Sequence, residues 1–243
     1  MIAINFGRIA YDEALRLQER CHEARVEGRI DDVILLLEHD PVITFGSSAV
    51  AEDLLVTEEE LARQGIPVHH VNRGGKITCH YPGQLVGYFI IDLNGFGRDI
   101  HRFVRGIEEA IIRVLADCGV QGETIRHMTG VWTRNSKIAA IGIEVRKGVT
   151  MHGFSLNIRD NAPIYSFFIP CGIRDRGVTS LERCLGPGRP TDIDEVSRCF
   201  LRHWSEVFQT PVASSISKKE FEMVCPSRGE IDGNGLLAER VTS

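Results

Sequence analysis

The sequence has no long apolar run, no excess of basic residues and no paired-cysteine motif. No stretch approaches the roughly 20 apolar residues that a membrane-spanning helix needs, and residues 1–8 lack the regions of a secretory signal peptide. The formal net charge of −5 gives the whole molecule no attraction to nucleic acid or to an anionic membrane. We therefore expect a cytoplasmic protein that binds neither nucleic acid nor membrane.

The cysteines and histidines do not form a recognisable metal motif. The seven cysteines are an odd number and include no Cys-x-x-Cys pair, so neither a disulfide framework nor a zinc knuckle is expected. His69 and His70 are neighbours in a predicted strand, where consecutive side chains point to opposite faces. These two imidazoles are therefore not expected to share an ion, and the sequence predicts no metal site.

Hydrophobic periodicity predicts one domain that mixes helices and strands. Apolar residues at helical spacing predict helices over 10–27, 99–118 and 191–209, the last capped by Thr191, and a Thr-x-x-Glu capping box predicts a short helix over 57–65. Apolar or alternating runs predict strands over 33–37, 42–46, 67–71 and 84–93 and a meander over 130–158. We expect a single α/β (α+β) domain over 1–211, with a mixed sheet flanked by helices. Residues 212–243 lose this period and are expected to form a peripheral, partly disordered extension.

The stretch 73–88 is the first candidate site. It carries glycines at 74, 75, 83 and 87, which let the backbone approach a ligand closely. Arg73 adds a fixed cation beside two of these glycines, and His80 adds a group that titrates near neutral pH. The stretch is equally consistent with a glycine-rich turn between two strands, in which His80 makes a structural hydrogen bond.

The second candidate site lies within residues 137–173. Cys171 stands between Pro170 and Gly172, on an irregular segment after an apolar run, where catalytic residues are common. A thiol becomes a nucleophile as a thiolate, which a nearby cation favours, and Lys137 and His152 are the candidates. Alternatively, Cys171 is a buried inert cysteine and Lys137 an exposed turn residue.

Three stretches, in this order, resemble the octanoyltransferase family, also called lipoate-protein ligase B. They read RGGKITCHYPGQLVGY, SKIAAIGIEVRKGVTMHGFSLNI and IPCGIRDRGVTSLE, and the resemblance covers roughly residues 5–210. It implies the mixed-sheet fold of the biotin- and lipoate-ligase catalytic domains. It also implies transfer of an octanoyl group from octanoyl-acyl carrier protein to a lysine of lipoyl domains, such as glycine cleavage H protein and the E2 subunits of 2-oxoacid dehydrogenases.

The resemblance also assigns residues. It implies that Cys171 carries the acyl-thioester, that Lys137 lowers the pKa of this thiol, and that no ATP, metal or other cofactor is needed because a thioester is already activated. The substrate-binding positions that it implies are Arg73, Gly74, Gly75, Lys76, Ile77, Thr78, Cys79, His80, Ala140, Ile141, Gly142, Gly153, Phe154 and Ser155. His152, a candidate from the residues alone, is assigned a supporting role. The chain departs from the usual family loop at Lys76, Cys79 and Tyr81.

Three other functions are compatible with parts of the sequence. An ATP-dependent lipoate or biotin ligase would share the fold but would adenylate a free acid. A catalytically silent protein would bind acyl groups or lipoyl domains without forming an acyl-enzyme. A Cys-His hydrolase would release free octanoate instead of passing the acyl group to a lysine.

Overall fold

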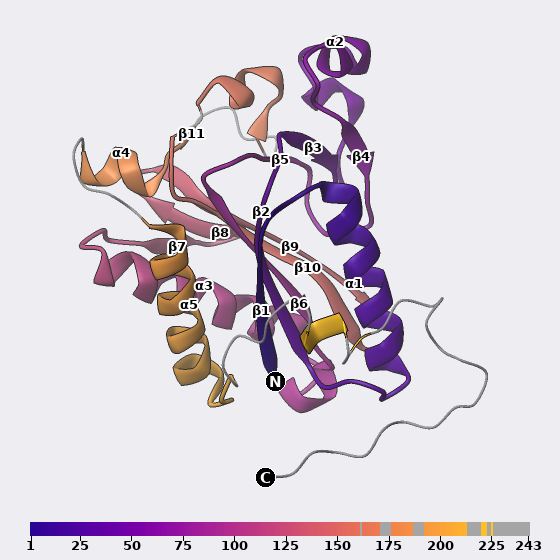
Figure 1. Cartoon of the computed structure of the whole chain (residues 1–243). Coiled ribbons are helices and arrows are strands. Elements are labelled where there is room, and N and C mark those ends of the chain that lie inside the picture. The colour runs from indigo at the N-terminus through magenta and orange to yellow at the C-terminus, as the bar shows by residue number, and fades with distance from the viewer. Residues whose placement is uncertain (161, 171–175, 187–191, 213–219, 223–224, 226–243) are drawn as a thin grey trace.

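A large mixed β-sheet forms the centre of the molecule, with helices on both faces and a small second sheet at one end (Figure 1). The computed structural model describes residues 1–160, 162–170, 176–186, 192–212, 220–222 and 225. Within these residues, the mixture of helices and strands confirms the predicted fold class.

The main sheet has the strand order β1-β2-β6-β10-β9-β8-β7, and β11 pairs with β9. These strands are β1 (Ile2–Ile9), β2 (Val33–His39), β6 (Gln84–Ile90), β7 (Glu123–Ile125), β8 (Met128–Thr133), β9 (Ser136–Arg146), β10 (Val149–Asn157) and β11 (Gly177–Val178). The pairs β1–β2 and β9–β11 are parallel, and the other pairs are antiparallel. The predicted meander is therefore present as β8, β9 and β10.

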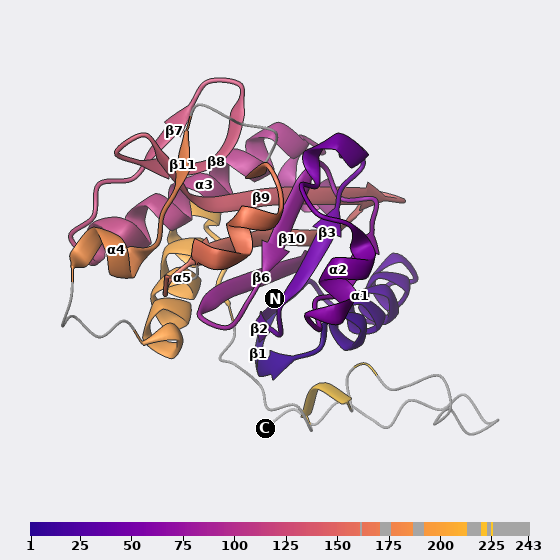
Figure 2. The same cartoon turned by 90° about the horizontal axis from the view of Figure 1, so that it is seen from above.

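The helices cover both faces of this sheet. Helix α1 (Tyr11–Val26) lies on one face, and α3 (Ile100–Asp117) and α5 (Ile193–Phe208) lie on the other (Figure 2). Strand β2 packs against both layers, because Ile34 and Leu36 join the apolar cluster under α3 and α5, whereas Leu35 joins the cluster under α1. Burial on both faces explains why β2 reads as a continuous apolar run.

The second sheet pairs β4 (Val68–His70), β3 (Val42–Phe45) and β5 (Ile77–His80) in that order. Short helices complete the described fold: η1 (Ala51–Asp53), α2 (Glu58–Arg63), η2 (Leu93–Phe96), η3 (Ala162–Phe167) and α4 (Leu181–Leu185). The capping box predicted at the start of α2 is confirmed, because the Thr57 hydroxyl accepts a hydrogen bond from the Glu60 amide while the Glu60 carboxylate accepts one from the Thr57 amide. The cap of α5 is Asp192, whose carboxylate accepts from the Asp194 amide; Thr191, the predicted cap, lies outside the described residues.

Part of the predicted C-terminal extension packs on the domain. The Phe221 ring meets the Phe6 ring edge-on at 5.5 Å, and the Cys225 sulfur lies 3.8 Å from the Cys21 sulfur on α1. Both Phe221 and Cys225 are buried. The boundary at residue 211 stays a prediction, and these contacts link the residues beyond it to the layer that α1 forms.

Candidate functional site

One cavity gathers the residues of both candidate stretches. It has a volume of about 340 Å³ and lies between the loop 73–76, β5, β9, β10 and the start of α1. The predicted site residues that line it are Arg73, Gly74, Gly75, Lys76, Ile77, Thr78, His80, Lys137, Ala140, Ile141, Gly142, His152, Gly153, Phe154 and Ser155. Segments that are distant in the sequence thus form one concave site of the kind that binds small ligands.

Arg73 fixes the shape of the glycine loop. Its guanidinium donates to the backbone oxygens of Thr44 at 2.7 Å, Lys76 at 2.8 Å and Gly74 at 3.1 Å, and to the Thr44 hydroxyl at 2.9 Å. Its side chain is buried, with a relative exposure of 8% for the residue. The sequence suggested a fixed cation beside a ligand; in this arrangement several guanidinium hydrogens bind the protein itself and tie the loop to β3.

Two glycines allow the backbones around the cavity to approach one another. A Cβ atom on Gly142 would lie 2.5 Å from the backbone oxygen of Gly74, and one on Gly153 would lie 1.9 Å from that of Gly87. The Gly74 amide also donates to the Ile143 oxygen at 3.1 Å, which fastens the loop to β9. Any larger residue at 142 or 153 would therefore force these segments apart.

Lys137 lies on β9 at one side of the cavity. It is buried, with a relative exposure of 9%, and its ammonium lies 5.3 Å from the centre of the Trp132 ring. Lys137 pairs with Val178 of β11 in the sheet, and the Lys137 backbone oxygen accepts a hydrogen bond from the Thr179 amide at 2.9 Å. The alternative of an exposed turn residue is therefore wrong for Lys137.

Cys171, the predicted nucleophile, lies outside the described residues, as do Gly172 and Ile173. The nearest described residues on either side are Pro170 and Arg176, which both line a second cavity of about 200 Å³. The Arg176 guanidinium lies 5.7 Å from the centre of the Trp132 ring, the same ring that Lys137 approaches. The described residues on either side of 171–175 therefore lie beside β11, whose Val178 lines the same cavity and pairs with Lys137.

Two neutral imidazoles pack together beside the cavity: His80 lines it, and the His39 ring lies 5.3 Å from the His80 ring. The Nδ1–H of His80 donates to the Gln84 side-chain oxygen at 2.7 Å, and the Nδ1–H of His39 donates to the Ile9 oxygen at 2.9 Å, while the Tyr88 hydroxyl donates to its Nε2 at 2.8 Å. Burial lowers the pKa of His39 to about 4 and that of His80 well below its usual range, the latter also because His39 is close. Both rings are therefore uncharged at neutral pH.

His152 lines the cavity from a strained position on β10. Its φ of 60° is in the left-handed region, which is rare for a residue with a side chain. The Gln18 side-chain oxygen of α1 accepts a hydrogen bond from the His152 amide at 2.8 Å, and the His152 Nε2 lies 3.7 Å from the Glu144 carboxylate. The neighbouring His152 side chain lowers the pKa of Glu144. The strained backbone and these contacts fix the His152 ring at the cavity wall.

The cavity differs from the predicted set in a few residues. Cys79, which the resemblance included, is fully buried in the apolar cluster of the second sheet and does not line the cavity. Side chains alternate along β5, so Thr78 and His80 face the cavity while Cys79 faces the other way. Five lining residues were not predicted: Tyr11, Tyr88, His127, Met128 and Thr129.

Comparisons with known proteins identify related chains. The family model described as the lipoyl protein ligase A/B catalytic domain matches residues 10–205. An octanoyltransferase of Caldicellulosiruptor saccharolyticus is 44% identical over 218 residues, which cover 89% of this chain and 92% of that relative. An octanoyltransferase of Desulforamulus reducens is 40% identical over 227 residues, covering 92% and 98%. The bipartite lipoate protein ligase of Thermoplasma acidophilum superposes with a TM-score of 0.67 over 100% of both chains at 19% identity, which supports the fold.

Proposed function

Because the chain belongs to the lipoyl protein ligase A/B catalytic-domain family, we propose that it transfers an octanoyl group from octanoyl-acyl carrier protein to a lysine of lipoyl domains through a thioester on Cys171. The acyltransferase assignment follows from the full-length similarity to octanoyltransferases. We further propose the identity of the donor, the thioester on Cys171 and the role of Lys137.

The observation that carries the proposal is the single cavity that Lys137 shares with the glycine loop and with the two small-residue segments 140–142 and 153–155. It offers apolar walls at Ile141, Phe154 and Met128 for an acyl chain, next to the buried ammonium of Lys137. Burial of each methylene contributes about 0.8 kcal/mol. The binding free energy of an octanoyl chain should therefore be more favourable than that of a two-carbon acyl group by several kcal/mol.

The first half-reaction forms the acyl-enzyme. The Cys171 thiolate attacks the carbonyl carbon of the donor thioester, the new carbon–sulfur bond forms, and the bond from this carbon to the carrier sulfur breaks. The carrier thiolate leaves and takes the proton of the Lys137 ammonium, which becomes a neutral amine. The ammonium of Lys137 stabilises both the Cys171 thiolate and the carrier thiolate electrostatically. A cation in this place therefore lowers the pKa of the Cys171 thiol. Because the donor is already a thioester, this step needs no ATP.

The second half-reaction passes the acyl group to the acceptor. The ε-amine of a lipoyl-domain lysine attacks the thioester carbonyl, an amide bond forms, and Cys171 leaves as a thiolate. The amine must lose a proton, which the neutral Lys137 amine can accept after the first thiolate has been consumed. The products are an octanoylated lysine and the regenerated ion pair of enzyme thiolate and ammonium.

The class of acceptor has more support than the donor has. Family membership supports a lipoyl domain as acceptor, and we propose that glycine cleavage H protein and the E2 subunits of 2-oxoacid dehydrogenases supply it. Among the described residues, no helix is long and apolar enough to cross a membrane. A free nucleophilic thiol requires a reducing compartment, and we propose the cytoplasm.

Intact-protein mass spectrometry without ATP tests the acyl-enzyme. The wild-type chain and the variants Cys171→Ala and Cys184→Ala are each mixed with octanoyl-acyl carrier protein. Cys184 is a half-buried free cysteine outside the cavity, so its variant is a matched control. We expect one octanoyl adduct on the wild type and on the control, and none on Cys171→Ala. An adduct that persists on Cys171→Ala, or acylation that requires ATP, would contradict the proposal.

A further inference from the structure

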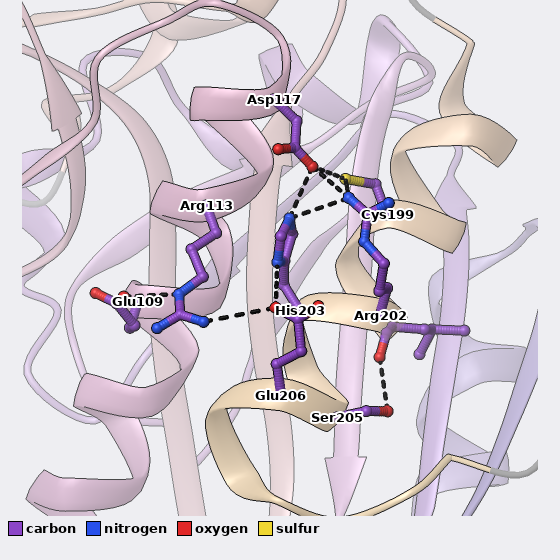
Figure 3. A network of polar contacts seen from close by, with 9 residues as sticks. Glu109, Arg113, Asp117, Cys199, Arg202, His203, Ser205 and Glu206 are labelled. Carbon is purple, nitrogen blue, oxygen red and sulfur yellow. Dashed lines mark hydrogen bonds and ion pairs between the residues drawn. The ribbon is translucent and has the colours of Figure 1, made fainter.

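Aspartate, cysteine and histidine side chains, which are residue types that can bind metals, meet where the end of α3 packs against α5 (Figure 3). The Asp117 carboxylate oxygen Oδ2 lies 2.7 Å from the Nε2 of His203 and 3.0 Å from the sulfur of Cys199. All three donor atoms lie within 4.8 Å of one another. Cys199 and His203 are four residues apart on α5, so they project from the same side of the helix. Within the described chain, no other group of three such donors is this compact.

The other nitrogen of His203 is held as it is in many metal sites. Its Nδ1 lies 3.0 Å from the Glu206 carboxylate, which accepts its hydrogen bond. Arg113 approaches the same carboxylate at 3.5 Å and is itself bonded to Glu109 (Figure 3). Metal-bound histidines usually donate their second N–H to a carboxylate, which orients the ring and directs the other nitrogen to the ion. This arrangement directs Nε2 toward Asp117 and Cys199.

A cation already lies on these donors. The Arg202 guanidinium contacts the Asp117 carboxylate, and the same nitrogen lies 3.4 Å from the Cys199 sulfur and 3.2 Å from the His203 Nε2. The Arg202 side chain is 58% exposed, so it can rotate into solvent without disturbing the core. The place is thus electrostatically suited to a positive ion and is covered by a side chain that can leave.

We propose that Asp117, Cys199 and His203 bind one Zn²⁺ ion that replaces the Arg202 guanidinium and links α3 to α5. Sulfur, nitrogen and oxygen donors together suit Zn²⁺, and a water molecule completes a tetrahedral set. Two bonds of about 2.1–2.3 Å at a tetrahedral angle separate donor atoms by about 3.5 Å. The distances between the donor atoms therefore need to change by only about 1 Å when the ion binds. The thiol proton of Cys199 is released to solvent as the sulfur binds.

This zinc would lie apart from the acyl-transfer cavity. Asp117, Cys199 and His203 are not among the residues that line the cavity with Lys137. The helices α3 and α5 provide the apolar layer on the sheet face opposite α1 (Figure 2). Bound metal therefore stabilises the packing of this layer and is not expected to take part in acyl transfer.

Titration of the metal-free full-length protein with Co²⁺ and then Zn²⁺ tests the proposal. Cobalt reports sulfur coordination through a charge-transfer band in the near ultraviolet, and zinc should displace it. We expect one site in the wild type, and binding weakened about a hundredfold or more in Cys199→Ser and in His203→Gln. The controls Cys118→Ser, one residue from Asp117, and Cys171→Ala should bind like the wild type.

Arg202→Gln provides a test that does not depend on damage to the site. Removing the competing cation should tighten Zn²⁺ binding by about tenfold and leave the cobalt spectrum unchanged. Zn²⁺ should also raise the melting temperature of the wild type but not that of Cys199→Ser. A wild type without a sulfur-to-cobalt band, or a band that survives in Cys199→Ser and disappears in Cys171→Ala, would overturn the proposal.

Discussion

Arg73 should prove to be a structural brace for the glycine loop, and Arg73→Met tests this. The substitution keeps most of the buried aliphatic volume but removes the donors to the backbone oxygens of Thr44, Lys76 and Gly74. A buried oxygen left without its partner costs about 1–3 kcal/mol, and removal of the buried charge offsets part of this sum. We expect the free energy of unfolding to fall by about 3–4 kcal/mol.

Urea unfolding followed by tryptophan fluorescence measures this loss, with two comparison variants. Arg73→Lys keeps the charge but cannot form the planar fork, so it should lose roughly half as much. Arg8→Met is the matched control because Arg8 is exposed and its ion pair with Asp40 is a surface contact; it should change stability by less than about 0.5 kcal/mol. If Arg73→Met unfolds like the wild type but no longer forms the acyl-enzyme, Arg73 binds substrate and the reasoning is wrong.

Three further predictions concern the cavity and its surroundings. Gly142→Ala places a Cβ atom 2.5 Å from the Gly74 oxygen and should slow octanoyl transfer roughly tenfold or more in a steady-state assay, whereas Gly95→Ala, where a Cβ meets nothing within 4 Å, should not. Lys137→Met should slow acyl-enzyme formation by roughly a hundredfold in rapid-quench mass spectrometry while the near-ultraviolet circular dichroism is kept; an unchanged rate would remove Lys137 from the mechanism. Because the pKa of His39 is lowered from 6.5 to about 4, the unfolded chain binds a proton that the folded chain does not. The free energy of unfolding should therefore fall by about 3 kcal/mol as the pH drops from near 6.5 to near 4. In urea titrations at a series of pH values, His39→Gln should not show this loss. Equal pH dependence of stability in the two proteins would contradict the prediction.

The sequence predicted the elements whose pattern is regular. The helices over 10–27 and 99–118 are present as α1 and α3 because each buries small and apolar residues at helical spacing, although the buried face of α1 also includes Gln18 and His22. Strand β1 was missed because Gly7 has a φ of 61° and the register with β2 shifts between Asn5 and Arg8, which interrupts the alternation that identifies a strand. Strand β5 was read as part of a glycine-rich loop, although residues 77–80 pair with β3.

The site was predictable to the extent that its residues lie in continuous motifs. Residues from two of the three motif stretches line the cavity, but Tyr11 and the segment 127–129 reach it only through the tertiary fold, and no local signal marks them. The inward or outward direction of Cys79 could have been inferred from alternation, had β5 been recognised as a strand. The hydrogen bonds from Arg73 to β3 depend on a pairing distant in sequence and could not be inferred from composition.

A single-turnover chase of the isolated acyl-enzyme tests whether Cys171 passes its octanoyl group to a lysine of a lipoyl domain. The octanoylated wild-type chain, freed of donor and ATP, is mixed with an unmodified lipoyl domain or with the same domain carrying arginine at its target lysine. We expect the octanoyl mass to leave Cys171 and to appear on the lysine-containing domain in one turnover, while the arginine variant stays unmodified. Release of free octanoate with no domain modified, or domain acylation that bypasses the octanoylated enzyme, would contradict this expectation.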